Sequence, residues 1–155
     1  MKKTLIAYFT RTGITKKLAE DTAKQTGTDL FAIEPVKEYS SSYLICVGQA
    51  KLENLQNARP AIKAKPQNLQ DYDTIVVMFP IWWFTCPNII LTFLEKNDLS
   101  GKTVIPVCTY GSSGKGSSEK AMTKVCKNAT FKPCIEATGL KDTAVATIAA
   151  AIKEA

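Results

Sequence analysis

The chain has 155 residues, of which 45% are hydrophobic and 22% charged, so it can bury one core and is expected to form a single domain over residues 1–155. It contains no histidine, which excludes a Ser-His-Asp triad, a Cys-His pair and any histidine-based metal site. The net charge of +6 favours anionic ligands or acidic partners, but no block of Lys and Arg and no basic-aromatic stripe occurs, so no nucleic-acid binding is expected.

The cysteine pattern and the hydropathy indicate the compartment. The five cysteines are scattered and never spaced C-x-x-C, which argues against a disulfide framework, a zinc site or a thioredoxin-like motif and favours a reducing compartment. No apolar run approaches the roughly 18 residues of a membrane span. The apolar run at the start of the chain ends before the basic residues that begin at Arg11, and no signal-peptide cleavage site follows. A signal peptide is therefore not expected. The sequence therefore predicts a soluble, cytoplasmic protein.

Apolar runs and helical spacings alternate along the chain. The runs predict five strands, at 4–9, 30–33, 75–79, 103–108 and 131–137. Apolar residues at helical spacing predict five helices, from 14 to about 27, from 43 to about 56, from Pro87 through Leu94, from Ser117 or Ser118 through Cys126, and from 145 through 152. The stretch 59–70, with two prolines, is expected to be irregular.

This alternation predicts a doubly wound α/β fold, in which a parallel sheet is covered by helices on both faces. Pro133 has no N–H to give to a ladder, so the last strand should lie at a sheet edge. In such sheets ligands bind outside the carboxyl ends of the strands, where the strand order switches. The loops that follow the strands are therefore the place to look for a site.

The loop after the first strand predicts a phosphate site. A strand that turns directly into a helix leaves free N–H groups at the helix start, and the helix dipole favours an anion there. Hydroxyls, a guanidinium and a glycine crowd the same stretch, Thr10-Arg11-Thr12-Gly13-Ile14-Thr15. The alternative interpretation is an ordinary polar turn between a strand and a helix.

The loop after the third strand is aromatic and reads Pro80-Ile81-Trp82-Trp83-Phe84-Thr85-Cys86-Pro87. In a strand, Trp82 and Trp83 would point to opposite sides, so at least one should be partly exposed. Exposed aromatic side chains usually meet a ligand or partner, and a flat aromatic ligand would account for them. The alternative is that both indoles pack onto the next helix as a lid.

The loop after the fourth strand is rich in glycine and hydroxyl groups, in the order Thr109-Tyr110-Gly111-Ser112-Ser113-Gly114-Lys115-Gly116. Its backbone amides can approach the polar edge of a ring closely. It is not a Walker A loop, and the dinucleotide fingerprint G-x-G-x-x-G is missing after the first strand.

Together these three loops resemble the flavodoxin family, and the similarity extends over nearly the whole chain. The first loop fits the family pattern [ST]-x-T-G-x-T, and Pro80-x-Trp82-Trp83 and T-x-G-x-S-G at 109–114 resemble a bacterial subgroup. The resemblance implies strand order 2-1-3-4-5 and bound FMN. Residues 10–15 would then hold the phosphate, while 80–84 and 109–114 would hold the isoalloxazine ring. Many relatives have Asn at Ile14 and Gly at Phe84 and Ser112.

The resemblance implies a low-potential electron-transfer protein. The net charge of +6 favours redox partners with acidic surfaces, and we expect a monomer or weak dimer. One alternative is an FMN-dependent NAD(P)H:quinone-type oxidoreductase, in which Lys115 or Arg11 attracts the dinucleotide phosphate. Another alternative is a flavodoxin-like module with an altered or empty flavin site. No catalytic acid or base is needed for electron transfer, which agrees with the missing histidine.

Overall fold

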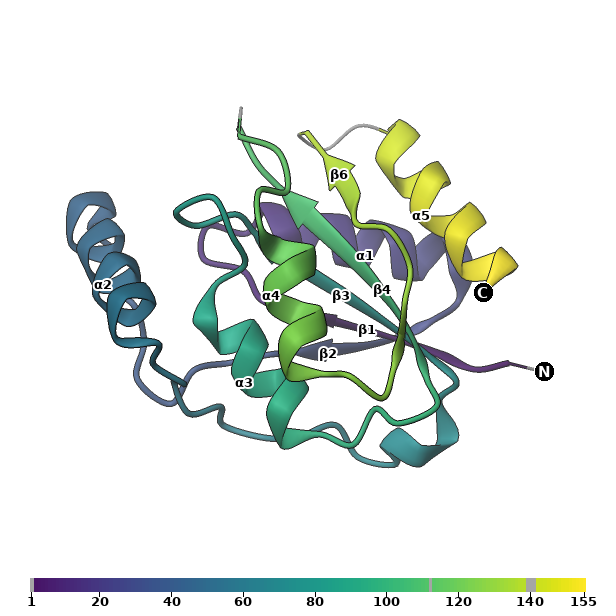
Figure 1. The fold of residues 1–155 in the computed structure, drawn as a ribbon. Helices are drawn as coiled ribbons and strands as arrows, with labels where there is room; N and C mark the ends of the chain where they lie inside the picture. The colour runs from purple at the N-terminus through teal and green to yellow at the C-terminus, as the bar shows by residue number, and fades with distance from the viewer. Residues whose placement is uncertain (1, 112, 139–141) are drawn as a thin grey trace.

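The computed structural model describes residues 2–111, 113–138 and 142–155, with strands and helices alternating along the chain (Figure 1). The strands are β1 (Thr4–Tyr8), β2 (Asp29–Ala32), β3 (Thr74–Pro80), β4 (Thr103–Thr109), β5 (Thr130–Phe131) and β6 (Ile135–Ala137). The helices are α1 (Ile14–Thr26), α2 (Tyr43–Gln56), α3 (Asn88–Lys96), α4 (Ser118–Val125) and α5 (Asp142–Glu154), with a 3₁₀ turn at Leu69–Asp71.

The strands form a parallel sheet in the order β2-β1-β3-β4-β5, and β6 pairs with β4 farther along. This confirms the predicted doubly wound fold and its order 2-1-3-4-5. The order reverses between β1 and β3, because β2 lies on one side of β1 and the later strands lie on the other. The carboxyl ends of β1, β3 and β4 therefore meet at one edge of the sheet, which is where such folds bind ligands.

The prediction of one continuous last strand over 131–137 is wrong. The structure has two short strands there, separated by residues 132–134. Pro133 cannot donate to the ladder, and the N–H of Cys134 donates instead to a carboxylate oxygen of Glu119 at 3.2 Å. Within residues 2–111, 113–138 and 142–155, both short strands pair only with β4, and they lie at the sheet edge, as predicted from Pro133.

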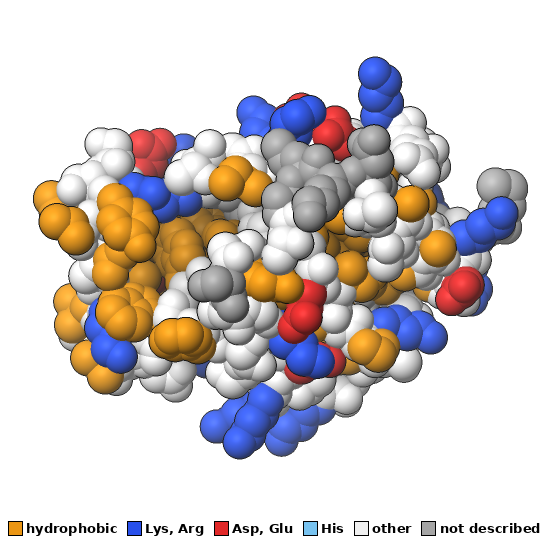
Figure 2. Space-filling view, turned by 90° about the horizontal axis from the view of Figure 1, so that it is seen from above, with side chains coloured by type: hydrophobic (Ala, Val, Ile, Leu, Met, Phe, Trp, Pro, Cys, Tyr) orange, Lys and Arg blue, Asp and Glu red, His pale blue; other side chains and the backbone are white. Residues whose placement is uncertain are grey.

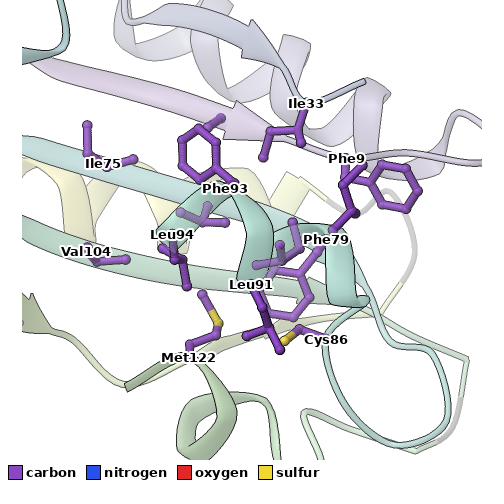
Figure 3. Close-up of a cluster of buried hydrophobic side chains, with 14 of the residues drawn as sticks. Phe9, Ile33, Ile75, Phe79, Cys86, Leu91, Phe93, Leu94, Val104 and Met122 are labelled. Atoms are coloured by element: carbon purple, nitrogen blue, oxygen red, sulfur yellow. The ribbon is translucent and has the colours of Figure 1, made fainter. Parts of the chain in front are cut away.

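Apolar side chains cover both faces of the sheet. On one face, α3 and α4 contribute Phe93, Leu94 and Met122 to a buried cluster (Figure 3). On the other face, α1 and α5 bury Leu18 and Ile148 against the strands. The prediction of a buried stripe on α3 is confirmed, although that helix begins at Asn88 and the predicted first residue, Pro87, precedes it.

Helix α2 lies apart from the sheet, at the far left of Figure 1. Only Cys46 and Ala50 of this helix are buried. Its C-terminal end is held by Asn88, whose side-chain amide donates to the carbonyls of Glu53 and Ala58, both at 2.9 Å. Among the described residues, none of the helices has the length and apolar character needed to cross a membrane.

Candidate functional site

The three predicted loops meet in one cleft of about 820 Å³ at the carboxyl edge of the sheet. Figure 2 shows a hollow with hydrophobic side chains on its floor. From the three predicted loops, the lining residues are Thr10, Arg11, Thr12, Ile14, Thr15, Pro80, Ile81, Trp82, Trp83, Phe84, Thr109, Tyr110, Gly111 and Ser113. Of the other predicted site residues, Gly13 and Gly114 do not line the cleft, and Ser112 lies outside the described residues.

The first loop makes the turn from β1 into α1 at Gly13. This residue has φ +97°, a left-handed conformation that side chains disfavour, and its N–H donates to the Thr10 hydroxyl at 3.0 Å. Gly13 caps α1 without a side chain, so no side-chain oxygen takes up the N–H groups of the first turn there. The positive end of the α1 dipole and these N–H groups lie beside the cleft-lining Thr12 and Thr15.

Thr15 and Thr109 join the first and third loops. Their hydroxyl oxygens lie 2.9 Å apart, and both side chains are buried. A hydroxyl can donate one hydrogen bond and accept others, so this link leaves each oxygen able to contact a further group. Thr15 therefore has a role that the sequence did not reveal: it fixes the spacing between two walls of the cleft.

Among the described residues that line the cleft, Arg11 is the one with a formal charge. Its guanidinium Nη2 donates to the carbonyls of Ser40 and Ser41, at 3.5 and 3.1 Å. Its Nε is buried without a hydrogen-bond partner within the described residues. Arg11 thus connects the first loop to the segment that leads into α2.

The second loop is a tight turn and not a strand. Trp82 and Thr85 exchange backbone hydrogen bonds at 2.9 and 3.3 Å, and the two residues between them, Trp83 and Phe84, have φ of +52° and +63°. Turns of this kind usually contain Gly or Asn, because L-residues are strained at positive φ. Strained residues concentrate at functional sites, where the surrounding structure holds them in place.

The two tryptophans pack against the protein in different ways. Trp82 lies edge-on to Phe9 and Tyr39, with ring centroids 5.3 and 4.9 Å apart. The Trp83 indole N–H donates to the Val47 carbonyl of α2 at 2.9 Å, and the Lys51 ammonium lies 4.7 Å from its ring centroid. The packing of Trp83 on α2 resembles the alternative in which the indoles form a lid, but that lid was expected on the following helix. Both tryptophans also line the cleft.

We expect Phe84→Gly to raise the free energy of unfolding by up to about 1 kcal/mol. The left-handed conformation costs an L-residue about 1–2 kcal/mol, and the extra chain entropy of glycine offsets part of that gain. The Phe84 side chain is 67% exposed, so its removal loses little packing. Urea unfolding of the flavin-free protein measures the change. Phe84→Ala is the control, because it removes the ring but keeps the strained Cβ, and should give no gain. A loss of stability in Phe84→Gly would mean that ring packing outweighs the strain.

The third loop docks onto the second through Gly116 and Ser117. The Ser117 N–H donates to the Phe84 carbonyl at 2.9 Å. Gly116 has φ +54°, and a Cβ added there would lie 1.8 Å from the Phe84 carbonyl oxygen. The Lys115 N–H donates to Glu136 at 3.0 Å, which attaches the same loop to β6. The sequence places Gly116 in this loop but does not indicate this contact.

Helix α2 forms a further wall of the cleft, which was not predicted from the sequence. Tyr43, Cys46, Val47 and Ala50 line the cleft from this helix, and Thr138 lines it from beyond β6. The i, i+4 and i+3 spacing of Tyr43, Val47 and Ala50 was visible as one helical face. Nothing in the sequence indicated that this face turns toward the loops.

A carboxylate–phenol pair anchors α2 beside Trp82. The Tyr39 hydroxyl lies 2.7 and 2.9 Å from the two carboxylate oxygens of Glu53. Burial raises the pKa of Glu53, and the hydrogen bond from Tyr39 lowers it by less, so the net shift is upward. The same burial and the Glu53 contact raise the pKa of Tyr39.

This pair predicts a pH dependence that Glu53→Gln should remove. In the folded state Glu53 keeps its proton to higher pH than in the unfolded chain, so its contribution to stability falls as pH rises from about 4.5 through the raised pKa. The unfolding free energy of the wild type relative to Glu53→Gln should therefore decrease across that window. Urea unfolding at a series of pH values measures it, and a constant difference would contradict the assignment.

Similarities to known proteins agree with this architecture. A family profile described as flavodoxin matches residues 3–147. A protein of known structure from Bacteroides eggerthii, provisionally described as a flavoprotein, is 33% identical over 99% of both chains, with a TM-score of 0.87. A counterpart from Bacteroides uniformis is 34% identical over 98% of both chains, with a TM-score of 0.85. A flavoprotein from Lactobacillus acidophilus, solved in complex with FMN, is 20% identical over 88% of this chain and 93% of that chain, with a TM-score of 0.78. No curated protein sequence matches this chain.

Proposed function

Because this chain belongs to the flavodoxin family, we propose that it binds FMN in the cleft and acts as a low-potential electron carrier. The observation that carries the proposal is the convergence of three strand-end loops on one cleft at the switch in strand order. When bound, the flavin supplies the redox chemistry. The protein supplies binding, orientation and the electrostatic surroundings.

The start of α1 fits the phosphate end of FMN. The first-turn N–H groups and the helix dipole favour an anion, and the hydroxyls of Thr10, Thr12 and Thr15 add hydrogen-bond donors. The Ile14 side chain has no polar group and cannot hydrogen-bond to the phosphate. At this position only the backbone N–H can contribute to phosphate binding. Arg11 adds a positive charge to the same wall.

The aromatic loop and the third loop fit the ring end. Trp82, Trp83 and Tyr110 offer flat surfaces, and Gly111 and Ser113 line the same cleft. The cleft volume of about 820 Å³ lies within the range that takes small-molecule cofactors. Size and lining chemistry therefore both suit a nucleotide with a planar head.

The lining residues favour a carrier over an enzyme. Within the described part of the chain, none of them is a carboxylate or a lysine, and the whole chain has no histidine, so the commonest general acids and bases do not line the cleft. Electron transfer needs no such group. The net charge of +6 suits redox partners that present acidic surfaces.

The visible spectrum of the purified protein, followed by titration of the flavin-free protein with FMN, tests the proposal. We expect a yellow protein, or a colourless one that quenches FMN fluorescence with one-to-one stoichiometry. A protein that stays colourless after FMN is added would contradict FMN binding. Sustained NADPH consumption by the FMN-loaded protein in the presence of a quinone would contradict the carrier role and favour an NAD(P)H:quinone oxidoreductase.

A further inference from the structure

Helix α2 carries a second apolar face, on the side away from the cleft. At about 100° per residue, one arc of the helix circumference contains only apolar residues and glycine. This outer face consists of Leu44, Ile45, Gly48, Leu52 and Leu55. Its four large side chains are between 55% and 79% exposed. In Figure 2 hydrophobic side chains gather at the left, on the α2 side of the hollow.

This pattern is abnormal for a helix on the surface of a monomer. Such helices turn one apolar stripe inward and a polar face outward, whereas the outward face of α2 is apolar as well. The inward side of α2 is already used by Cys46 and Ala50. Since contiguous exposed apolar patches mark interaction sites, the outer face indicates a binding surface.

We infer that the outer face of α2 binds the same face of a second copy, giving a homodimer in which two α2 helices pack side by side. Ile45, Gly48, Leu52 and Leu55 repeat at the 3-4-3 spacing of a coiled-coil seam. A two-fold axis places the same face on both partners, so a face suited to packing on another helix is also suited to packing on itself. Nothing lies within 4 Å of a Cβ built on Gly48, so the helices can approach closely there.

The charge distribution favours a second copy at this face. Each copy carries a net charge of +6, so most surfaces of two copies repel each other. The two charged residues of α2 point elsewhere: Lys51 lies over the Trp83 ring and Glu53 contacts Tyr39. The outer face is therefore a charge-free surface on a basic protein.

Two other occupants fit less well. A redox partner must approach the cleft, whereas this face lies on the opposite side of α2 from the cleft-lining Cys46 and Val47. Membrane-surface helices combine an apolar face with several Lys or Arg residues, and α2 has only Lys51.

The length of the helix sets the strength of the dimer. Two 14-residue helices lie along each other over about 21 Å. We expect a single helix pair of this length to bury less than the roughly 800 Å² per partner of a standard interface, so the dimer should be weak and concentration-dependent. Added salt should tighten it, because salt screens the repulsion between the two basic copies.

Sedimentation equilibrium of the full chain, from micromolar to millimolar concentration, tests this inference. We expect a monomer–dimer equilibrium whose dissociation constant falls as salt is added. Leu52→Glu should raise the dissociation constant at least tenfold. Val36→Glu is the matched control, because Val36 is also exposed but lies outside α2, and it should leave the constant unchanged.

The assay measures mass and does not depend on flavin binding, so it separates this inference from the proposed function. Because the Leu52 side chain is solvent-exposed, we expect the Leu52→Glu variant to fold. Circular dichroism checks this. A wild type that stays monomeric throughout, or a dimer that survives Leu52→Glu, would overturn the inference. So would a monomer that binds anionic lipid vesicles through α2.

Discussion

Gly116→Ala is expected to lower the free energy of unfolding by about 3 kcal/mol and to weaken FMN binding at least tenfold. The added Cβ would lie 1.8 Å from the Phe84 carbonyl oxygen, and 2.6 Å from its carbon, so the backbone of one loop must move. Overpacking of this kind costs about 1–3 kcal/mol, and an L-residue at the positive φ of Gly116 adds about 1 kcal/mol. The movement separates the second and third loops, which share the hydrogen bond from Ser117 to Phe84.

Urea unfolding and FMN titration measure the two effects separately. Gly111→Ala is the matched control for stability: Gly111 lies in the same loop, and no heavy atom lies within 4 Å of a Cβ built there. It should unfold within about 0.5 kcal/mol of the wild type. If Gly116→Ala were as stable as Gly111→Ala, the third loop would not dock on Phe84 as the structure shows.

The double substitution Thr12→Ala and Thr15→Ala is expected to weaken FMN binding by about 3 kcal/mol, or more than a hundredfold in dissociation constant. Each hydroxyl can donate a hydrogen bond to the phosphate, and a bond to a charged group contributes about 1.5–3 kcal/mol. Thr15→Ala also removes the contact between the hydroxyls of Thr15 and Thr109, which loosens the cleft itself. Fluorescence titration of the flavin-free proteins with FMN measures the loss.

Two controls separate the ligand contacts from the structural link. Ser at both positions keeps the hydroxyls and should restore most of the affinity. Thr109→Val removes the partner of Thr15 but leaves both predicted phosphate contacts in place, so it should weaken binding less than the double substitution. Affinity that is unchanged in the double variant would place the phosphate elsewhere.

The fold was predictable because burial on both faces of a parallel sheet leaves a strong signal. Runs such as 75–79 are continuous and apolar, and they became strands that are completely buried. The end of a helix was also predictable where the chain needs a left-handed residue. An example is Gly27, which follows α1 and has φ +70°. The meeting of the three loops followed from topology, since parallel strands place their carboxyl ends on one edge.

The parts that were missed depend on contacts between distant residues. The turn conformation of Trp83 and Phe84 is imposed by the docking of Gly116 and Ser117 on the Phe84 carbonyl, which local propensity does not encode. The α2 wall depends on tertiary anchors such as Asn88. The last strand was predicted as continuous because Pro133 was interpreted only as a sign of an edge strand. Pro133 also interrupts the strand, which the prediction did not include.

The break at Pro133 has a consequence for how the molecule behaves at high concentration. A long, straight outer strand would offer unpaired N–H and C=O groups to a neighbouring chain, the starting point for fibril growth. Here one margin of the sheet consists of β5 and β6, with two and three residues, and the other is β2 with four. Both margins are short, which disfavours the pairing of this sheet with a strand of another chain.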